Sequence, residues 1–167
     1  GGNCLFRCSQ GRWIILWKMS QEVANYTHIA DLRSAMSHAI DNGDVIKIEP
    51  KWDHHFANGL YGRRIYVPAG TTVVTKVHMT QHITIALKGT CVMVDELNGH
   101  KKVEAPGMWV TEPGTQRAIH CIDDTEWVTV HATCIKDDID AVEAEIFSDD
   151  FDEYYQRIKA LPEAVEM

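Results

Sequence analysis

Two histidines four residues apart, His78 and His82, are the residues of this sequence most suited to chemistry. They lie in the segment KVHMTQH, with Lys76 two residues before the first histidine. The flanking segments, TTVVT and ITIALK, are rich in residues that favour β-strands, so the spacing is not that of a helix face. Because side chains alternate between the two faces of a strand, all three residues share one parity. A strand pair with a short turn could therefore aim them at one interior, where imidazole nitrogens could hold a metal ion.

The elements that must position these residues are strands. From Gly43 onward the hydrophobic pattern has a period of two over most of the chain, which predicts strands rather than helices. Turn signals with Pro-Gly or Asn-Gly character separate them, including Asn98-Gly99 between two runs, which favours a tight hairpin. The predicted strands are VIKIE, YGRRIYV, TTVVTKVH, HITIALK, TCVMVDE, KKVEA, MWVTE, QRAIH and EWVTVHATC. Many short strands without helices between them predict an antiparallel sandwich or barrel.

Helical spacing is found on both sides of this region. Apolar residues recur every three or four positions from His28 to Ile40, with Thr27 as a possible N-cap and Asp41-Asn42-Gly43 as a stop. The acidic segment after Asp137 also has helical spacing, interrupted around Ser148, which predicts two short helices packed on the barrel. His54 and His55 are expected to follow Trp52-Asp53 in a polar loop, and adjacent histidines could not both face one site on a strand.

The strand region resembles the cupins, small β-barrels with two conserved motifs. The first motif is a glycine, five residues, His-x-His, three or four residues, a glutamate, six residues and a glycine. Here Gly70 and Gly89 enclose the segment at the right spacing, with Lys76 in place of the first histidine and His82 in place of the glutamate. The resemblance implies a mainly β protein, a cupin-type antiparallel barrel (double-stranded β-helix, or jelly roll) with one N-terminal helix and one or two C-terminal helices.

The second cupin motif is matched in part. Gly107 and Pro113 keep its first half, but its glycine is shifted to Gly114 and its histidine position falls on Ala118; His120 lies two residues further along the same strand. The resemblance covers roughly residues 61–132. A fainter one, to small cupin-like proteins of unknown function encoded by tailed phages, rests on the segment from YGRRIYVPAG to EWVTVHAT. We expect residues 1–18 to be a non-native or arm extension, 19–50 the N-terminal helix and leading strand, 51–135 the barrel and 136–167 the acidic helices.

In cupins the motif residues converge on one divalent metal in the barrel mouth. The resemblance therefore implies metal ligands at His78, His82 and His120, with a divalent transition metal such as zinc, iron, manganese or nickel as cofactor. A metal-free pocket, with these histidines bonded to one another or to water, is the alternative. Four residues are candidates for substrate binding: Lys76, Arg63 and Arg117, whose cations suit an anionic substrate, and His131, which shares parity with Trp127 and Thr129. Glu112, beside a Pro-Gly turn at the barrel rim, is the candidate catalytic acid or base.

Composition narrows the partners. A formal net charge of -8 argues against nucleic acid, whose backbone is bound by clustered lysine and arginine. No apolar stretch approaches the ~20 residues that span a bilayer, so no membrane partner is expected. The five cysteines follow no repeated spacing, and a reducing cytoplasmic location fits them best.

Two classes of function remain open at this stage. One is a metal-dependent enzyme that acts on a small molecule inside the barrel. The other is a non-catalytic binding or assembly module with a degenerate cupin site. Ile83, Ile85 and Leu87 should point away from the pocket, so helices or a second subunit must cover them. We therefore predict a homodimer.

Overall fold

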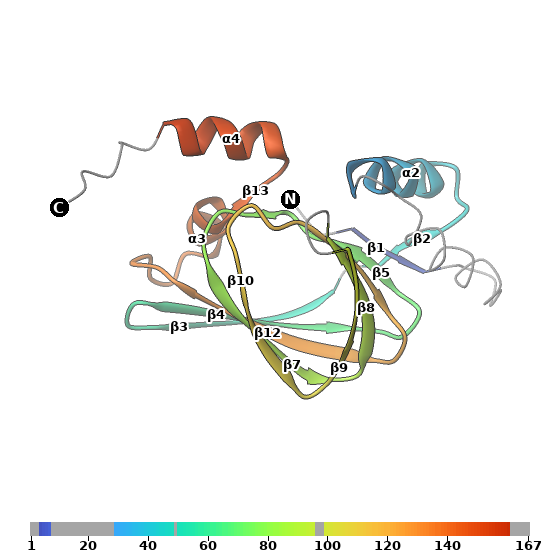
Figure 1. Cartoon of the computed structure of the whole chain (residues 1–167), viewed down its shortest axis with the longest axis horizontal. Helices are drawn as coiled ribbons and strands as arrows, with labels where there is room; N and C mark the ends of the chain where they lie inside the picture. The colour runs from blue at the N-terminus through green and yellow to red at the C-terminus, as the bar shows by residue number, and fades with distance from the viewer. Residues whose placement is uncertain (1–3, 8–28, 49, 96–98, 161–167) are drawn as a thin grey trace.

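A computed structural model describes residues 4–7, 29–48, 50–95 and 99–160 of the chain. Two antiparallel sheets face each other and enclose the core (Figure 1). The six-stranded sheet has the order β2 (Ile46–Ile48), β1 (Cys4–Arg7), β5 (Thr72–Val74), β11 (Arg117–Cys121), β8 (Thr90–Asp95) and β9 (Gly99–Glu104). The five-stranded sheet has the order β10 (Gly107–Thr111), β7 (His82–Lys88), β12 (Thr125–Ala132), β4 (Leu60–Val67) and β3 (Lys51–Ala57). The predicted antiparallel cupin-type barrel is confirmed.

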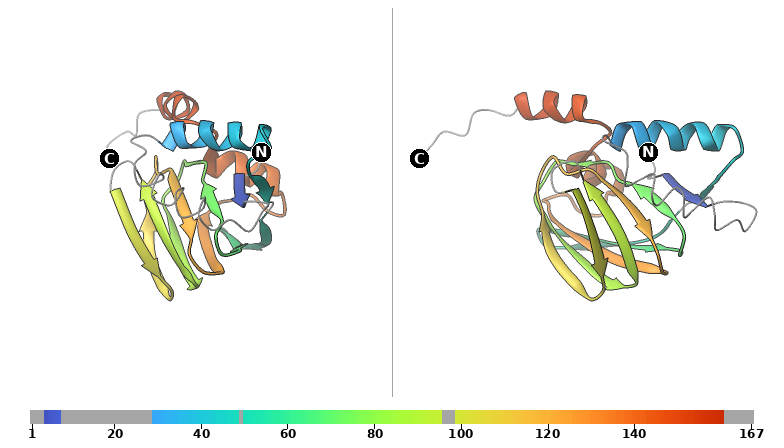
Figure 2. Two further views of the ribbon diagram at one scale, coloured as in Figure 1. Left: turned by 90° about the vertical axis from the view of Figure 1, so that its right-hand side faces the viewer. Right: turned by 45° about the vertical axis from the view of Figure 1, so that its right-hand side comes forward.

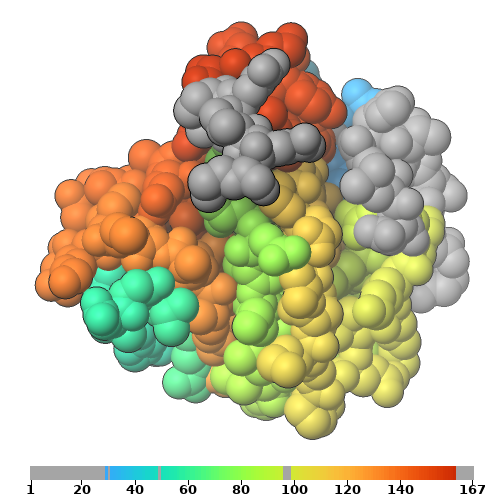
Figure 3. Space-filling view, turned by 60° about the vertical axis from the view of Figure 1, so that its left-hand side comes forward, coloured from blue at the N-terminus to red at the C-terminus, as the bar shows by residue number. Residues whose placement is uncertain are grey.

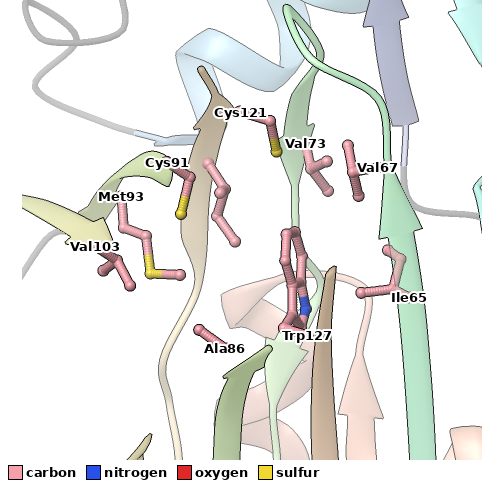
Figure 4. Packing of buried hydrophobic residues seen from close by; sticks show 10 residues of the cluster. Ile65, Val67, Val73, Ala86, Cys91, Met93, Val103, Cys121 and Trp127 are labelled. Carbon is pink, nitrogen blue, oxygen red and sulfur yellow. The ribbon is translucent and has the colours of Figure 1, made fainter. Parts of the chain in front are cut away.

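Alternating burial along the strands defines the inside of the barrel. In β12, for example, every second residue from Thr125 to His131 is buried, while the residues between them are half-buried. The inward apolar side chains of both sheets meet in one cluster, with Trp127 beside Ile65 and Ala86 (Figure 4). Burial of this cluster is the main apolar contribution to the stability of the barrel.

The strand register arranges the interior in layers. Between β12 and β7, Trp127 lies opposite Ala86, Thr129 opposite Thr84 and His131 opposite His82. The interior therefore changes from apolar at one end of these strands to hydroxyl and then imidazole side chains at the other. This gradient places the polar chemistry at one mouth of the barrel.

Helix α2 (Ile29–Asp41) covers the outer face of the six-stranded sheet. Its apolar side chains, including Leu32 and Met36, pack against Val74, Val94 and Ala118 of three strands. The helix predicted over this segment is confirmed, and the chain leaves it through Gly43, which has a positive φ of 76°. The proposed Thr27 cap lies outside the described residues. None of the described helices has both the length and the apolar character that crossing a membrane demands.

The two predicted acidic helices are also confirmed. Helices α3 (Ile139–Ile146) and α4 (Phe151–Lys159) begin at Asp138 and Asp150, whose side chains accept hydrogen bonds from backbone N–H groups of the first turn. Between them, β13 (Phe147–Ser148) pairs with β6 (Val77–His78). This two-residue ladder ties the C-terminal segment to the mouth of the barrel. The orange and red helices α3 and α4 lie near one end of the barrel (Figure 2).

The structure corrects the expected loop at residues 53–55. These residues belong to β3, which pairs with β4 over its whole length. Trp52, His54 and Phe56 are half-buried on one face, while the residues between them are exposed. The sequence of this segment does alternate, but its inward residues are only half-buried and include a histidine, because this edge strand is only partly covered. The segment therefore looked polar throughout.

Two further expectations concern the N-terminal segment and a hairpin. Cys4–Arg7 form β1, which pairs with both β2 and β5 inside the six-stranded sheet. The other residues of the predicted 1–18 extension lie outside the described part of the chain. The predicted pairing of the strands on either side of Asn98-Gly99 is found in β8 and β9, while Asn98 itself lies outside the described residues.

Candidate functional site

Three buried histidines meet at the mouth of the barrel. His78 comes from β6, His82 from the start of β7 and His131 from the end of β12, where it lies directly opposite His82. Each offers one ring nitrogen to a group in which all the candidate ligand atoms lie within 4.8 Å of one another. The ring centroid of His82 is 4.3 Å from that of His78 and 4.2 Å from that of His131.

The ring nitrogens have few hydrogen-bond partners. Among the described residues, Nδ1 of His78, Nε2 of His82 and both nitrogens of His131 are buried without one. Nδ1 of His82 lies 3.2 Å from the carbonyl oxygen of Thr80. If Nδ1–H donates to that carbonyl, Nε2 keeps its lone pair for a ligand, the arrangement found for metal-bound histidines. Buried polar atoms normally have partners, so unpartnered nitrogens that converge on one point fit a metal ion.

The surroundings keep the three imidazoles neutral. Burial lowers the pKa of His82 to about 4 and that of His131 to about 3. Burial, followed by the neighbouring His82 and His131, holds the pKa of His78 well below its usual value. Arg63 contributes in the same direction at all three histidines. Neutral imidazole is the metal-binding form, so the site has its ligands ready at pH 7.

His120, the third ligand implied by the cupin resemblance, is not brought to this group. It lies on the face of β11 that carries Ala118, the face packed against α2, and its Nδ1 is 2.9 Å from Oγ1 of Thr72. Ile119, its neighbour, is the residue that faces the barrel interior. His131, expected at a substrate position, joins His78 and His82 in the group that could hold a metal ion.

The cationic side chains predicted for substrate binding do line the interior. Lys76, Arg63 and Arg117 border a cavity of about 40 Å³ beside His78 and His82. The remaining wall is aromatic, hydroxyl and apolar, and consists of Trp52, Trp109, Trp127, Phe147, Thr75, Thr84, Thr129, Ile65, Val73, Met93 and Ile119. At the ~10–15 Å³ that an enclosed water needs, there is room for roughly three waters or a molecule of a few heavy atoms.

Glu112, the predicted acid or base, does not border this cavity. It is exposed, and both its carboxylate oxygens accept hydrogen bonds from Nε2 of Gln81, at 3.1 and 3.0 Å. A solvated carboxylate held by a surface amide has no contact with the three histidines in the described structure. It therefore takes no part in the site that the structure assembles.

Phe147 is a site residue that sequence reasoning missed. Its ring lies edge-on to His78 at 5.1 Å and to His131 at 6.0 Å, between centroids. On its other side the guanidinium of Arg63 stacks over the ring at 4.5 Å. The backbone of the preceding residue, Ile146, also accepts a hydrogen bond from the N–H of Met79 at 2.9 Å. The C-terminal segment thus closes the mouth over the histidines and limits the access of water.

Comparison with solved structures finds likeness in the barrel. An acetylacetone dioxygenase from Acinetobacter johnsonii is 14% identical with a TM-score of 0.42, over 50% of this chain and 60% of that one, less than two thirds of its length. An RmlC-like cupin with a double-stranded β-helix fold from Methanocaldococcus jannaschii is 15% identical, with a TM-score of 0.43, over 50% of this chain and 79% of that one. A cupin-2 domain protein from Shewanella frigidimarina is 14% identical, with a TM-score of 0.41, over 51% and 80%. No family model and no curated protein matches the sequence.

The strand order and the position of two histidines agree with the barrel that the sequence predicts. Two facing antiparallel sheets enclose an apolar core, and His78 and His82 of the first motif lie at one mouth of the barrel. Gly70 and Gly89, which bound that motif, both adopt positive φ angles of 73° and 87° at turns where glycine is favoured. The described strands thus form the antiparallel two-sheet barrel that the cupin resemblance of the sequence implies.

Proposed function

We propose that this protein is a metal-dependent enzyme whose centre is held by His78, His82 and His131. The observation that supports the proposal is the convergence of three buried, neutral histidines, each with at least one ring nitrogen that has no partner among the described residues. Imidazole suits zinc, iron, manganese and nickel. Three protein ligands leave positions open, as a catalytic site requires, whereas structural sites are closed by four.

The residues of the chain would divide the work among them. The Thr80 carbonyl fixes the tautomer of His82, and Phe147 shields the ligands from water. The cationic and aromatic wall of the cavity orients a small molecule beside His78 and His82. When bound, the ion supplies Lewis-acid chemistry, as in an isomerase or lyase, and a redox-active ion would also suit an oxygenase.

Elemental analysis of the untagged protein tests the proposal. We expect about one equivalent of a divalent transition metal, because the three histidines form a single ligand set. The substitutions His78→Ala, His82→Ala and His131→Ala should each abolish it. The matched control is His120→Ala, which removes a buried histidine outside the group and should leave the metal content unchanged.

Thermal unfolding gives an independent measurement. Free metal at 100 times its Kd stabilises the folded state by about 2.7 kcal/mol, which for a chain of this length raises the Tm by roughly 5–10 °C. The proposal fails if the wild type holds far less than one equivalent of any transition metal and added metal leaves its Tm unchanged. That outcome would favour the non-catalytic binding module.

A further inference from the structure

The lining of the cavity beside the histidines contains cationic but no carboxylate side chains among the described residues. Three cationic side chains border it, and no aspartate or glutamate is found among its described lining residues. The carboxylates that pair with these cations lie outside the lining: Glu143 with Arg63 at 3.1 Å, Asp149 with Lys76 at 2.7 Å and Asp95 with Arg117 at 3.8 Å. The cations therefore border the cavity directly, while the carboxylates that balance their charges do not.

Arg117 is the cation with the most capacity for a ligand. Its Nη1 donates to Oγ1 of Thr111 at 3.0 Å, and its Nε forms an ion pair with Oδ2 of Asp95 at 3.8 Å. A guanidinium has five N–H donors in a planar fork, so some of them remain available to a ligand after the described contacts are made. Arg63 is more fully engaged, since its guanidinium lies over the rings of Trp52 and Phe147 and donates to Glu143.

The strand register brings Arg117 close to the histidines. Thr111, its hydrogen-bond partner, lies directly opposite His82 in the β10–β7 pair. Consistent with this, the Arg117 charge contributes to the lowered pKa of both His78 and His82. A ligand in the cavity can therefore contact the guanidinium and the face of the histidine group together.

From this geometry we infer that the site takes a small planar anion with two oxygen atoms, of the carboxylate or enolate class, with Arg117 as its charge partner. The inference rests on the proposed metal centre. Three neutral histidines leave the charge of a divalent ion uncompensated, and an anion would neutralise it in a cavity without a carboxylate. The arginine fork matches two oxygens in a plane. The cavity of about 40 Å³ limits the reacting part of the ligand to a few heavy atoms.

Cobalt-loaded protein provides the test, since the visible spectrum of Co²⁺ reports on its ligands. The first step is to measure the cobalt content. Acetate is then titrated at constant ionic strength, in parallel with acetamide, which has nearly the same size and shape but no charge. We expect acetate to change the spectrum and reach saturation, and acetamide to have no effect at the same concentrations. This comparison needs no variant, so a folding defect cannot confuse it.

Substitution then locates the charge partner. Arg117→Gln should raise the Kd for acetate at least about tenfold, the effect of losing a charge-assisted hydrogen bond. The control is Arg64→Gln, on the outer face of the same barrel and paired with Glu126, which should leave the Kd unchanged. If cobalt binds but acetate acts no differently from acetamide, or Arg117→Gln binds acetate as the wild type does, the anion assignment is overturned and the metal centre stands. If cobalt does not bind, both proposals fall.

Discussion

At the scale of single residues, the histidine group couples the stability of the barrel to pH. The rings of His82 and His131 stack with centroids 4.2 Å apart in a buried site. Protonation would place two charges in contact in surroundings of low polarity, which is strongly unfavourable. The group is therefore compatible with the fold only while it is neutral or bound to a metal ion.

We expect metal-free protein to lose stability as the pH falls below about 6.5, the ordinary histidine pKa in the unfolded chain. The folded pKa values are lower, about 4 for His82 and about 3 for His131, so the unfolded state binds protons first. The contribution of the neutral histidines to the free energy of unfolding is complete above pH ~6.5. As the pH falls it decreases by up to about 1.4 kcal/mol per pH unit for each histidine, until about pH 4 for His82 and about pH 3 for His131.

Urea unfolding of metal-free protein between pH 7 and 5 measures this slope. His131→Leu removes one titrating group and should make the slope shallower, while His55→Leu, an exposed position, should leave it unchanged. A wild-type stability that stays constant over this range would contradict the burial of neutral histidines.

At the scale of elements, the turn between β7 and β8 is built around a glycine in close contact with another turn. Gly89 has a φ of 87°, and a Cβ atom there would lie 2.9 Å from Cα of Thr125 and closer still to the carbonyl oxygen of Asp124. A side chain at this position would have to push the backbone of the next turn away. The requirement explains, in physical terms, why a glycine ends the first motif.

Gly89→Ala should therefore destabilise the protein more than an ordinary glycine substitution. We expect a loss of about 2–5 kcal/mol, from left-handed backbone strain of ~1–2 kcal/mol and overpacking of ~1–3 kcal/mol. Gly59→Ala is the control, because Gly59 has a similar φ of 77° but no atom within 4 Å of the added Cβ. Urea unfolding measures the loss of unfolding free energy in each variant. Equal losses in Gly89→Ala and Gly59→Ala would show that the close approach at Gly89 does not contribute to the cost of the substitution.

At the scale of the whole molecule, the five-stranded sheet carries exposed apolar side chains on the outer face of β10 and β7. Figure 3 shows one side of the molecule, coloured by position in the chain. Met108, Val110, Ile83 and Leu87 are 71%, 53%, 41% and 48% exposed, so the helices do not cover this face. Val110 lies opposite Ile83, and the row continues to Val130 on β12, which makes the apolar surface continuous across the three strands. Continuous apolar surfaces of this kind mark interfaces.

A second copy of the chain is the occupant that we propose, as a homodimer. A flat apolar sheet face is complementary to another like itself, since sheets pack face to face. The nearby charges on this side, Arg64 and Glu126, form an ion pair with each other, so two chains of net charge -8 need not bring unpaired acids together there. The interface leaves the histidine mouth, on the inner side of the same strands, free in each copy.

Light scattering at micromolar concentration checks the dimer. The double substitution Met108→Lys and Val110→Lys should weaken it at least about tenfold, because lysines would face one another across the interface. Ile46→Lys, at a residue 49% exposed on the other sheet, should have no effect. A wild-type monomer would overturn the homodimer, and equal dissociation in both variants would place the interface elsewhere.

The sequence by itself determined most of the elements of this protein. Period-two alternation predicted most of the strands, and three-and-four spacing predicted the helices before and after them. The spacing between Gly70 and Gly89 placed His78 and His82 in one motif, as the structure places them at one mouth. These features are local, because each depends on neighbouring residues and on the geometry of a single strand, turn or helix.

Only the tertiary structure decided which third histidine joins the pair. On β12 just one face is fully buried. His131 shares that face with Trp127, so the sequence already indicated that its side chain points into the barrel. On β11 both faces are covered, one by the opposite sheet and one by α2, so Ala118, Ile119 and His120 are all buried. The sequence of such a strand does not alternate between apolar and polar residues, so it cannot indicate which face points into the barrel. That is decided by where the helix packs. The same holds for Phe147, which reaches the site through a pairing between segments almost 70 residues apart.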